Sequence, residues 1–585
     1  MKQLADNLME MGLAMKLKVK RRIPEYIEKW AYVDILGGLA GIIGGLSVVV
    51  FKLLIGWSQK AFMSMSDLIK IYFYDFNLAI LIIIFIGGLM VGLITSKIAP
   101  EVRGHGLPEI MEAIHLKGGV MNTKNAFARI LASAITLGSG GSAGRVGPTI
   151  QIGATICSFL SRTLRLPMRM AKLLIVCGLS SSVAGLFNAP VAGAIFGIEV
   201  IYRRLEPMDI IPILIASFTG SIVSLILIGD EPLINIEYAF ISHPIELVFH
   251  VILGLITGLI AILWIRILYL IEDLFIKIRI PKPIKPAIGG LIAGSIGILI
   301  PDYGVLGLGY EGIEAVLNGE LTISLLLIIL GLMKMIATSL TLGSGGCGGI
   351  FAPTIYIGCM IGGGIGLLIQ DLIPSLTSQC EIYPLIGMAS MIAGTLHAPL
   401  TALILIPEMT ECYELLIPLI ISSPISYFIS WTLMDGSSIY TLKLERKGIN
   451  IKLLTSPLFE TLTVNDIMRR NILIMKADMP ISLLEVWMIE HEHGIIPVVL
   501  GDKIIGIITI KELEKISFEE GSKVKAKDII SRDFTIINSR ESLISALNIM
   551  NENDTDKLLV VNENNEILGI IFKEDILTLL RKFKT

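Results

Sequence analysis

The sequence predicts an all-α polytopic membrane domain with broken helices, followed by a small α+β tail. Three observations support this prediction. The 585 residues are 53% hydrophobic and 17% charged, with a mean hydropathy of +0.76, whereas charged residues usually make up about a quarter of a soluble domain. Long sequence blocks recur within the first 445 residues, and the apolar character stops near Met434.

Six long uncharged runs predict membrane-spanning helices. A helix needs roughly 20 apolar residues to cross a bilayer core of about 30 Å. The longer runs meet this requirement, and the shorter ones fit buried or partial spans. So many runs are not expected from the core helices of a soluble protein. The runs are Ile35–Phe51, Leu78–Ile94, Ile210–Gly229, Leu247–Ile265, Ala287–Pro301 and Leu415–Met434.

The first 30 residues carry many charges and precede the first apolar run, so we expect no cleavable signal. Basic residues in this segment indicate a cytoplasmic anchor by the positive-inside tendency. A solvated amphipathic helix is an alternative that is compatible with this interpretation. The basic residues are Lys16, Lys18, Lys20, Arg21 and Arg22.

Composition also excludes several classes of protein. The net charge of −3 gives no indication of nucleic-acid binding. The six cysteines show no paired metal-ligand spacing, and we expect them to be small core residues without a metal site or a disulfide framework. No nucleophile–base pair stands out, so an enzyme is not predicted.

Two blocks recur in the same order in the apolar part. Residues 136–153 read TLGSGGSAGRVGPTIQIG and residues 341–358 read TLGSGGCGGIFAPTIYIG, identical at 12 of 18 positions with an offset of 205. An Ala-Pro pair follows each block and leads to Glu199 in the first copy and Glu408 in the second, with an offset of 209. The membrane domain is therefore two copies of one unit.

Each glycine-rich block predicts a broken helix. The runs GSGGSAG and GSGGCGG have poor helix propensity, and Pro148 and Pro353 then stand near the start of a new helix. Unwound backbone at membrane depth is tolerated only inside protein or beside a water-filled cavity. Repeat-built transporters bind substrate where broken helices meet, and free N–H groups at a helix start favour an anion. We therefore predict an anion site; the alternative is that the glycines only permit close helix packing.

Four segments resemble the CLC family of chloride channels and chloride/proton exchangers, in the family's order. They are GHGLPE at 104–109, GRVGP at 144–148, GIFAP at 349–353 and SIYTL at 438–442. The resemblance covers essentially the whole chain. It implies a homodimer in which each subunit has two inverted repeats and its own pore, with chloride as substrate and no required cofactor.

The resemblance also implies the residues of the site. The N–H groups of Ile350 and Phe351 and the hydroxyl of Tyr440 are expected to hold a central anion, which the side chain of His105 completes. An outer anion position is expected along the backbone of four consecutive residues: Gly144, Arg145, Val146 and Gly147.

Two departures from the family pattern bear on mechanism. Val146 stands where the family usually has its gating glutamate, and Val200 stands at the internal proton-relay position. Glu199 is a candidate substitute relay because ionisable groups inside a membrane are usually functional. Its repeat partner Glu408 favours a shared structural role instead, such as capping. Passive anion flow is therefore the preferred interpretation.

His105 is a third departure, because the family commonly has serine there. An imidazole can donate an N–H to chloride and adds positive charge when protonated. Its size also predicts a narrower pore or a changed anion preference. The alternative is a histidine turned away into a satisfied core position. His397, in the turn of the second repeat, is expected to hydrogen-bond at a helix end.

The tail carries a weaker repeat in residues Val464–Leu513 and Ala526–Leu577, each predicted to form a β-α-β-β-α unit. It resembles a tandem pair of CBS domains. Such pairs often hold an adenine nucleotide through a threonine or serine and an aspartate three residues on. The first module offers Thr509 with Glu512, and the second offers Phe572 with Asp575. Neither pair is complete, so nucleotide binding at Thr509 and Asp575 and a purely structural, dimer-stabilising tail both remain open.

These observations predict a multi-pass membrane protein with both termini in the cytoplasm. The expected divisions are an N-terminal segment 1–30, a transmembrane anion domain 31–445, a linker 446–459, a first CBS module 460–516 and a second 524–583. The predicted function is passive chloride transport that the tail regulates. The alternatives are a proton-coupled exchanger with an unorthodox relay through Glu199 or His105, and a membrane-tethered nucleotide sensor. Expected partners are small anions, the lipid bilayer and a second copy of the chain.

Overall fold

The computed structural model places most of the chain in two compact units. One contains Met1–Ile114 and Gly119–Lys443, and the other contains His115–Gly118 and Leu444–Thr585. The described residues are 2–69, 72–73, 76–77, 79–204, 206–229, 245–301, 303–374, 382–449, 462–470, 472–481, 495–501, 503–509, 512, 524–532, 534–553 and 555–582, with the backbone alone for residues 2–30, 72–73, 76–77, 552 and 580–582.

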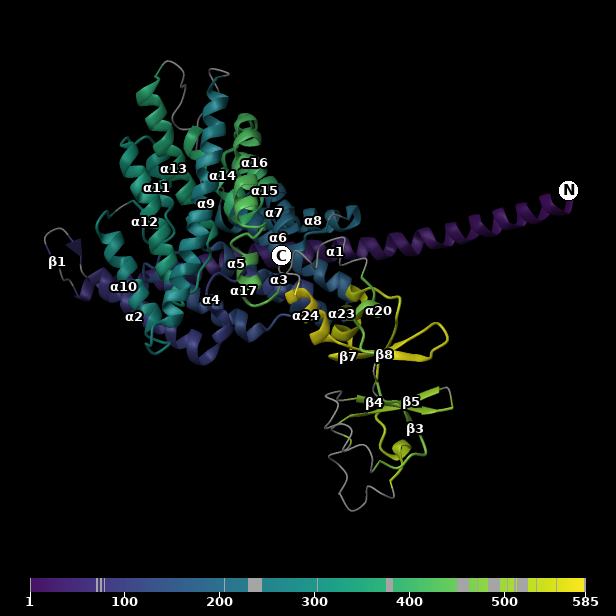
Figure 1. Cartoon of the computed structure of the whole chain (residues 1–585). Coiled ribbons are helices and arrows are strands. Elements are labelled where there is room, and N and C mark those ends of the chain that lie inside the picture. Colours follow the sequence, from purple (N-terminus) through teal and green to yellow (C-terminus); the bar gives the residue numbers. More distant parts are fainter. Residues whose placement is uncertain are drawn as a thin grey trace. The chain divides into compact units, whose positions relative to one another are not determined.

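The first unit is helical (Figure 1), and eight of its described helices are long and apolar enough to cross a membrane. Helix α1 (Lys2–Ile69) spans with its part Ala31–Ile69, and α2 (Ala79–Leu93) continues into a π-helix, η1 (Ile94–Ile98). The others are α6 (Met168–Phe187), α8 (Pro207–Ile228), α9 (Glu246–Lys277), α12 (Ser324–Gly343), α13 (Phe351–Leu372) and α16 (Leu416–Leu433), which extends the 3₁₀ turn η4 (Tyr413–Leu415).

Shorter elements connect these helices. Five of the six predicted apolar runs fall in spanning helices, and the sixth, Ala287–Pro301, forms the shorter α10 (Lys285–Ile298). Strands β1 (Tyr72–Phe73) and β2 (Phe76–Asn77) pair antiparallel. The other short helices are η2 (Pro100–Val102), α3 (Leu107–Leu116), α4 (Thr123–Gly138), α5 (Val146–Thr163), α7 (Pro190–Phe196), η3 (Gly197–Tyr202), α11 (Tyr310–Leu317), α14 (Ile382–Leu396), α15 (Pro399–Thr410) and α17 (Thr441–Arg446).

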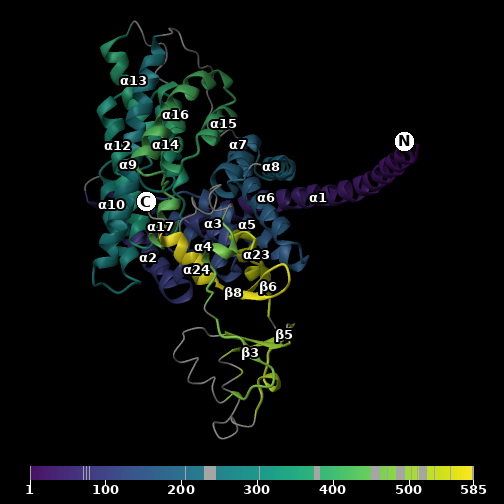
Figure 2. The same cartoon turned by 45° about the vertical axis from the view of Figure 1, so that its right-hand side comes forward.

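Close helix contacts depend on glycine. Helix α13 packs against α14, and α9 packs against α16. Both views show these four helices in the same part of the unit (Figures 1 and 2). A Cβ on Gly358 of α13 would lie 2.4 Å from Gly387 O of α14, and one on Gly387 would lie 2.2 Å from Gly358 O. Because lipid tails are as apolar as leucine, helices in membranes associate through such small-residue contacts.

The two sequence copies fold alike. A break separates α4 from α5 at residues 139–145, and α12 from α13 at residues 344–350, as the sequence predicts. In each break a glycine has a left-handed conformation, with φ +94° at Gly140 and +109° at Gly345. Helices α6 and α14 then end at Asn188 (φ +51°) and His397 (φ +57°), before the Ala-Pro pairs that start α7 and α15.

The second unit contains two small sheets with the same topology. Strands β3 (Met475–Lys476), β4 (Ile495–Leu500) and β5 (Lys503–Thr509) form one, and β6 (Ile536–Asn538), β7 (Lys557–Val561) and β8 (Ile567–Phe572) form the other. In each, the first pair is parallel and the second is antiparallel, with a register shift at the second of two valines. The described helices are α20 (Val464–Ile467), η6 (Ala526–Asp528), α23 (Leu543–Glu552) and α24 (Lys573–Lys582). The helix predicted between β3 and β4 lies outside the described residues.

Candidate functional site

Three glycine-rich segments from distant parts of the sequence lie against one another in the membrane unit. Gly104 donates its N–H to Gly346 O at 3.0 Å, and Gly348 donates to Gly104 O at 3.4 Å. Gly144 and Gly349 exchange two backbone hydrogen bonds of 2.7 and 2.6 Å. Three of the predicted anion segments are therefore neighbours in space.

The backbones approach more closely than a side chain would allow. A Cβ on Gly147 would lie 2.6 Å from His105 O, and a Cβ on Gly349 would lie 2.9 Å from Gly147 N. Real Cβ atoms do not make such contacts, so these two positions require glycine. The close backbone contacts therefore explain why glycine stands at these two positions of the predicted motifs.

Two helices begin at this convergence. The first helical hydrogen bond of α13 runs from Thr354 N to Ile350 O at 3.0 Å, and that of α5 runs from Thr149 N to Arg145 O at 3.2 Å. Among the described residues, the N–H groups of Ile350 and Phe351 have no hydrogen-bond acceptor. Free amides at a helix start, together with the helix dipole, form a favourable environment for an anion.

Aromatic side chains enclose the start of α13. The Phe351 ring lies 5.2 Å from that of Phe187 and 5.9 Å from that of Phe196, centroid to centroid. Phe351 and Ile350 are each 1% exposed. The low dielectric of such surroundings strengthens the interaction of an anion with the amides.

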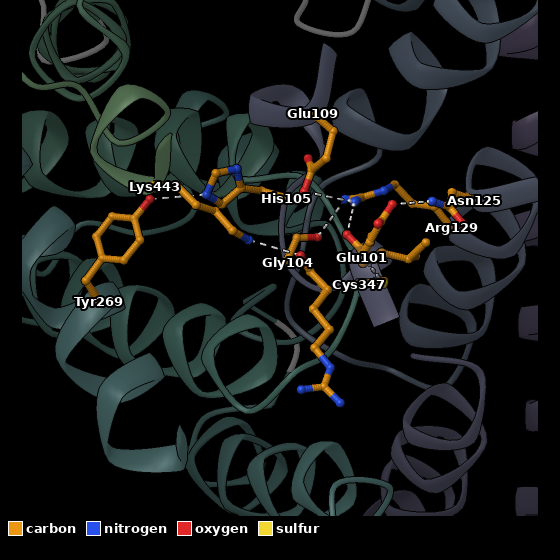
Figure 3. A network of polar contacts seen from close by, with 11 residues as sticks. Glu101, Gly104, His105, Glu109, Asn125, Arg129, Tyr269, Cys347 and Lys443 are labelled. Carbon is orange, nitrogen blue, oxygen red and sulfur yellow. Dashed lines mark hydrogen bonds and ion pairs between the residues drawn. The ribbon is translucent and has the colours of Figure 1, made fainter. Parts of the chain in front are cut away.

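Tyr440 and His105 lie beside each other. Both are buried, and their ring centroids are 5.5 Å apart at an angle of 57°. Tyr269 lies with its hydroxyl 3.4 Å from His105 Nε2 (Figure 3) and donates to Ile439 O at 2.5 Å. The structure therefore brings together His105 and Tyr440, which are far apart in the sequence, and it adds Tyr269, which was not predicted from the sequence.

Both valines that depart from the family pattern are buried. Val146 is the first residue of α5 and is 1% exposed, and Val200 lies in η3 and is 2% exposed. A valine side chain carries no charge and binds no proton. These two positions therefore contribute only shape and hydrophobic contact.

Glu199 caps a helix of the opposite repeat. It accepts from Leu400 N at 2.9 Å and Thr401 N at 2.8 Å, and also from the Thr401 hydroxyl at 2.7 Å. Glu408 accepts in the same way from the first-turn amides of α7, at 3.0 and 2.7 Å. A carboxylate at a helix N-terminus satisfies free amides and complements the dipole. The predicted capping geometry is present in both repeats.

Arg129, fully buried on α4, holds the first glycine-rich segment in place. Its guanidinium donates to Gly104 O and to Glu101 O, each at 3.3 Å, and lies 3.4 Å from Glu109 Oε1 (Figure 3). An ionisable residue inside a membrane is costly and usually functional. Arg129 was not predicted from the sequence, although it is the sole charged residue in the stretch 126–138.

Lys443 supports the same segment from α17. Its Nζ donates to Arg103 O at 3.0 Å, and a Cβ on Gly104 would lie 2.5 Å from that Nζ. Lys443 lies in α17, and Tyr440 directly precedes that helix. No sequence pattern indicated this contact, because nothing local relates residues 103 and 443.

The nucleotide candidates of the tail both have protein partners. Thr509 donates to Glu512 through its N–H, at 3.0 Å, and through its hydroxyl. Asp575 accepts three hydrogen bonds of 2.7 to 3.2 Å from Arg469, whose guanidinium stacks 4.7 Å above the Phe572 ring. Thr509 and Asp575 form no hydrogen bond with each other in the described part of the tail.

The cysteines form no site among the described residues. Cys157, Cys177, Cys347, Cys359 and Cys412 are buried and form no disulfide within the described part of the chain, and Cys380 lies outside the described residues. The described residues contain no group of three His, Cys, Asp or Glu that could hold a metal ion. His397, at the end of α14, lies 3.2 Å from Ser430 Oγ through Nε2, as expected of a hydrogen-bonding residue at a helix end.

Comparison with known proteins agrees with this geometry. The family model described as "Voltage gated chloride channel" matches residues 87–431, and the CBS domain model matches residues 464–519 and 526–582. The H(+)/Cl(-) exchange transporter ClcA of Yersinia pestis is 28% identical over 422 residues, which cover 70% of this chain and 87% of that protein. ClcA of Salmonella paratyphi A is 30% identical over 397 residues, covering 66% and 82%.

Solved structures share the fold. A slow cyanobacterial Cl-/H+ antiporter is 26% identical with a TM-score of 0.63, covering 71% of this chain and 97% of its own. A eukaryotic CLC transporter is 17% identical with a TM-score of 0.68, covering 93% and 97%. The family model covers more than half of the chain, in the region that holds most of the converging segments. The chain therefore belongs to the voltage-gated chloride channel (CLC) family of membrane anion transport proteins and carries two CBS domains in its tail.

Proposed function

We propose that this CLC protein conducts chloride passively, without coupling to protons. The observation that carries the proposal is the pair of buried valines, Val146 and Val200. Val146 has no carboxylate to compete with an anion at the start of α5. Neither valine can bind a proton, so the path lacks both groups that exchangers of this family are expected to use.

The converging segments supply the proposed anion path. The amides of Ile350 and Phe351 hold the central anion, and the Tyr440 hydroxyl and the His105 imidazole complete its coordination. The backbone of Gly144–Gly147 forms the outer position. The free amides at the start of α13 and the 5.5 Å separation of the two rings support this assignment. No buried lysine is required, because amide dipoles provide the positive potential.

A proton relay through Glu199 is the second candidate, and the exchange transporters among the relatives favour it. Its carboxylate, however, already accepts three hydrogen bonds from the start of α15. Protonation would turn one accepting oxygen into a donor that faces other donors, which costs hydrogen-bond energy. The Glu199 carboxylate is therefore poorly suited to bind and release a proton in every transport cycle.

We infer the oligomeric state, the orientation of the termini and the role of the tail from the family. The protein forms a homodimer with one pore per subunit and with both termini in the cytoplasm. The tail tunes conduction through its packing and has no required cofactor. The Arg469–Asp575 pair argues against the membrane-tethered nucleotide sensor, because the carboxylate that would bind ribose is engaged by a guanidinium.

The test is chloride efflux from loaded liposomes with the external pH recorded at the same time. A potassium ionophore clamps the voltage, and protein-free liposomes provide the baseline. We expect chloride to leave without proton movement in fixed ratio. Proton uptake in constant proportion to chloride would contradict passive conduction and favour the Glu199 or His105 relay. Absence of chloride flux in either direction would contradict the proposal as well.

A further inference from the structure

The second repeat contains a short glycine segment that corresponds to the first anion segment. Residues 307–309 read GLG and lead directly into α11, just as residues 104–106 read GHG and lead directly into α3. All four glycines have left-handed backbone, with φ of +85° and +88° in the GHG segment and +62° and +93° in the GLG segment. Such values favour glycine, so the two segments share both sequence and conformation.

Each of these segments binds the helix break of the opposite repeat. The GHG segment binds the break between α12 and α13 through Gly104, as described above. Gly307 makes the corresponding bonds to the break between α4 and α5, where its N–H donates to Gly140 O and its carbonyl accepts from Ala143 N, each at 3.3 Å. Ala143 directly precedes Gly144, so the GLG segment supports the backbone that leads into the proposed outer anion position.

Lys334 holds the GLG segment in the way that Arg129 holds the GHG segment. The two cations are 205 residues apart, which is the offset of the glycine-rich blocks. The Lys334 ammonium donates to Gly307 O at 3.0 Å and to Gly304 O at 2.8 Å, whereas Arg129 donates to Gly104 O at 3.3 Å (Figure 3). Lys334 is fully buried in the middle of the spanning helix α12 and forms no ion pair within the described residues. A lysine at that depth is costly and usually functional.

Two further contacts join the loop around the GLG segment to the same break. Ser142 Oγ donates to Val305 O at 2.9 Å and lies 2.9 Å from Thr338 Oγ1 of α12. The Arg145 guanidinium stacks over the ring of Tyr310, the first residue of α11, at 5.1 Å. The loop therefore contacts the chain both before and after the start of the outer anion position.

We propose that Lys334 is a positioning residue for the outer anion position and acts through the GLG segment. The inference rests on the proposed function, because that function places an anion along Gly144–Gly147. The ammonium fixes the carbonyl of Gly307, and this carbonyl fixes the N–H of Ala143. Amides that are held rigidly by such supporting bonds keep the spacing on which discrimination between ligands depends. Lys334 thus determines how well the pore distinguishes chloride from an anion of another size and shape, such as planar nitrate.

Three substitutions test this role through the ratio of the half-saturating concentrations of chloride and nitrate in liposome efflux. Lys334→Met removes the donors, and we expect the ratio to change by about threefold to tenfold, the worth of one net hydrogen bond. Lys334→Arg should stay within about twofold of the parent, because arginine serves at the corresponding position 129. Ser142→Ala removes the bond to Val305 O without any change of charge and should shift the ratio in the same direction as Lys334→Met.

The ratio separates positioning from simple electrostatic attraction. Loss of a positive charge weakens the binding of two monovalent anions alike and leaves their ratio unchanged. Tyr356→Phe is the matched control for a general loss of stability. The Tyr356 hydroxyl donates to Tyr303 O at 2.6 Å, in the same loop but outside the contacts with the break. This variant should lower the thermal midpoint and leave the ratio unchanged.

An unchanged ratio in both Lys334→Met and Ser142→Ala would overturn the proposal, and so would an equal shift in Tyr356→Phe. If Lys334→Met does not fold, Ser142→Ala decides alone, with an unchanged ratio as the contrary result. Proton movement coupled to chloride in the parent would contradict passive conduction but would leave this ratio measurable. If the parent conducts neither anion, calorimetric titration of the detergent-solubilised protein with sodium chloride and with sodium nitrate gives the ratio for the same variants.

Discussion

Glu199 and Glu408 each cap a helix in the other's repeat. Glu199 binds the first-turn amides of α15 at 2.9 and 2.8 Å, and Glu408 binds those of α7 at 3.0 and 2.7 Å. The two carboxylates thus make the same interaction twice, across the junction of the two halves. This reciprocity assigns both a structural role and explains why a glutamate occurs at the same place in each copy.

Neutralising either cap should have the same effect on stability. Glu199→Gln and Glu408→Gln each replace charge-assisted hydrogen bonds at a helix start, and we expect a loss of about 1–3 kcal/mol. Thermal unfolding in detergent measures it. Chloride efflux should remain uncoupled from protons in both variants. Proton movement in the parent that disappears in Glu199→Gln alone would contradict the structural role.

Val146→Glu should place a titratable gate at the start of α5. A carboxylate there competes with chloride when it is ionised and not when it is protonated. Chloride efflux should therefore fall as the pH rises through the pKa of the new carboxyl group, which is about 4.3 for a free glutamate. Efflux should recover on acidification.

Val146→Gln is the matched control for this gate. It has nearly the same size without the ionisation, so its efflux should not depend on pH. Equal pH dependence in the two variants would show that steric bulk, and not charge, accounts for the change.

Arg129→Gln should destabilise the first glycine-rich segment. The substitution leaves Glu109 without its buried partner and removes donors from Gly104 O and Glu101 O. Breaking a buried ion pair costs about 3–5 kcal/mol. We expect a large drop in the thermal midpoint and a loss of chloride efflux. Arg129→Lys retains the charge and should keep part of the stability, and equal losses in both variants would implicate the guanidinium geometry instead.

Asp575→Asn should loosen the second tail module without lowering its affinity for adenine nucleotides. The Arg469–Asp575 pair is partly exposed, so we expect a cost of about 1 kcal/mol. Faster hydrogen exchange at Ile570, whose N–H donates to Arg469 O, would report it in the full-length protein. Glu563→Gln breaks the far more exposed Arg540–Glu563 pair and should leave exchange unchanged. A marked loss of nucleotide affinity in Asp575→Asn would instead place Asp575 at the ribose.

The broken helices were predictable because they follow from local chemistry. Glycine runs disfavour helix and proline permits a new start, so the breaks before Val146 and Phe351 could be read from the residues alone. Spans such as α13 were not recognised as apolar runs, because glycine, threonine and proline dilute their hydropathy. Their burial within the unit makes a strongly apolar surface unnecessary.

The supporting contacts were not predictable, since they join residues that are far apart in the sequence. Arg129 reaches Gly104, Lys443 reaches Arg103, and Tyr269 reaches His105 only once the helices are packed. A lone charge in an apolar stretch marks Arg129 as unusual but does not reveal its partner.

The reciprocal capping by Glu199 and Glu408 also bears on how such a chain can arise by duplication. One repeat alone carries a carboxylate and a helix start with free amides. In this structure the carboxylate of a repeat does not accept hydrogen bonds from the helix start of the same repeat. Two repeats can cap each other's helix starts, whether they are separate molecules or are fused in one chain. A founding half would therefore have gained stability by pairing with a second copy, and fusion keeps that gain within one chain. Either half of the present protein is expected to be less stable alone than within the whole chain, because its helix start then lacks its cap.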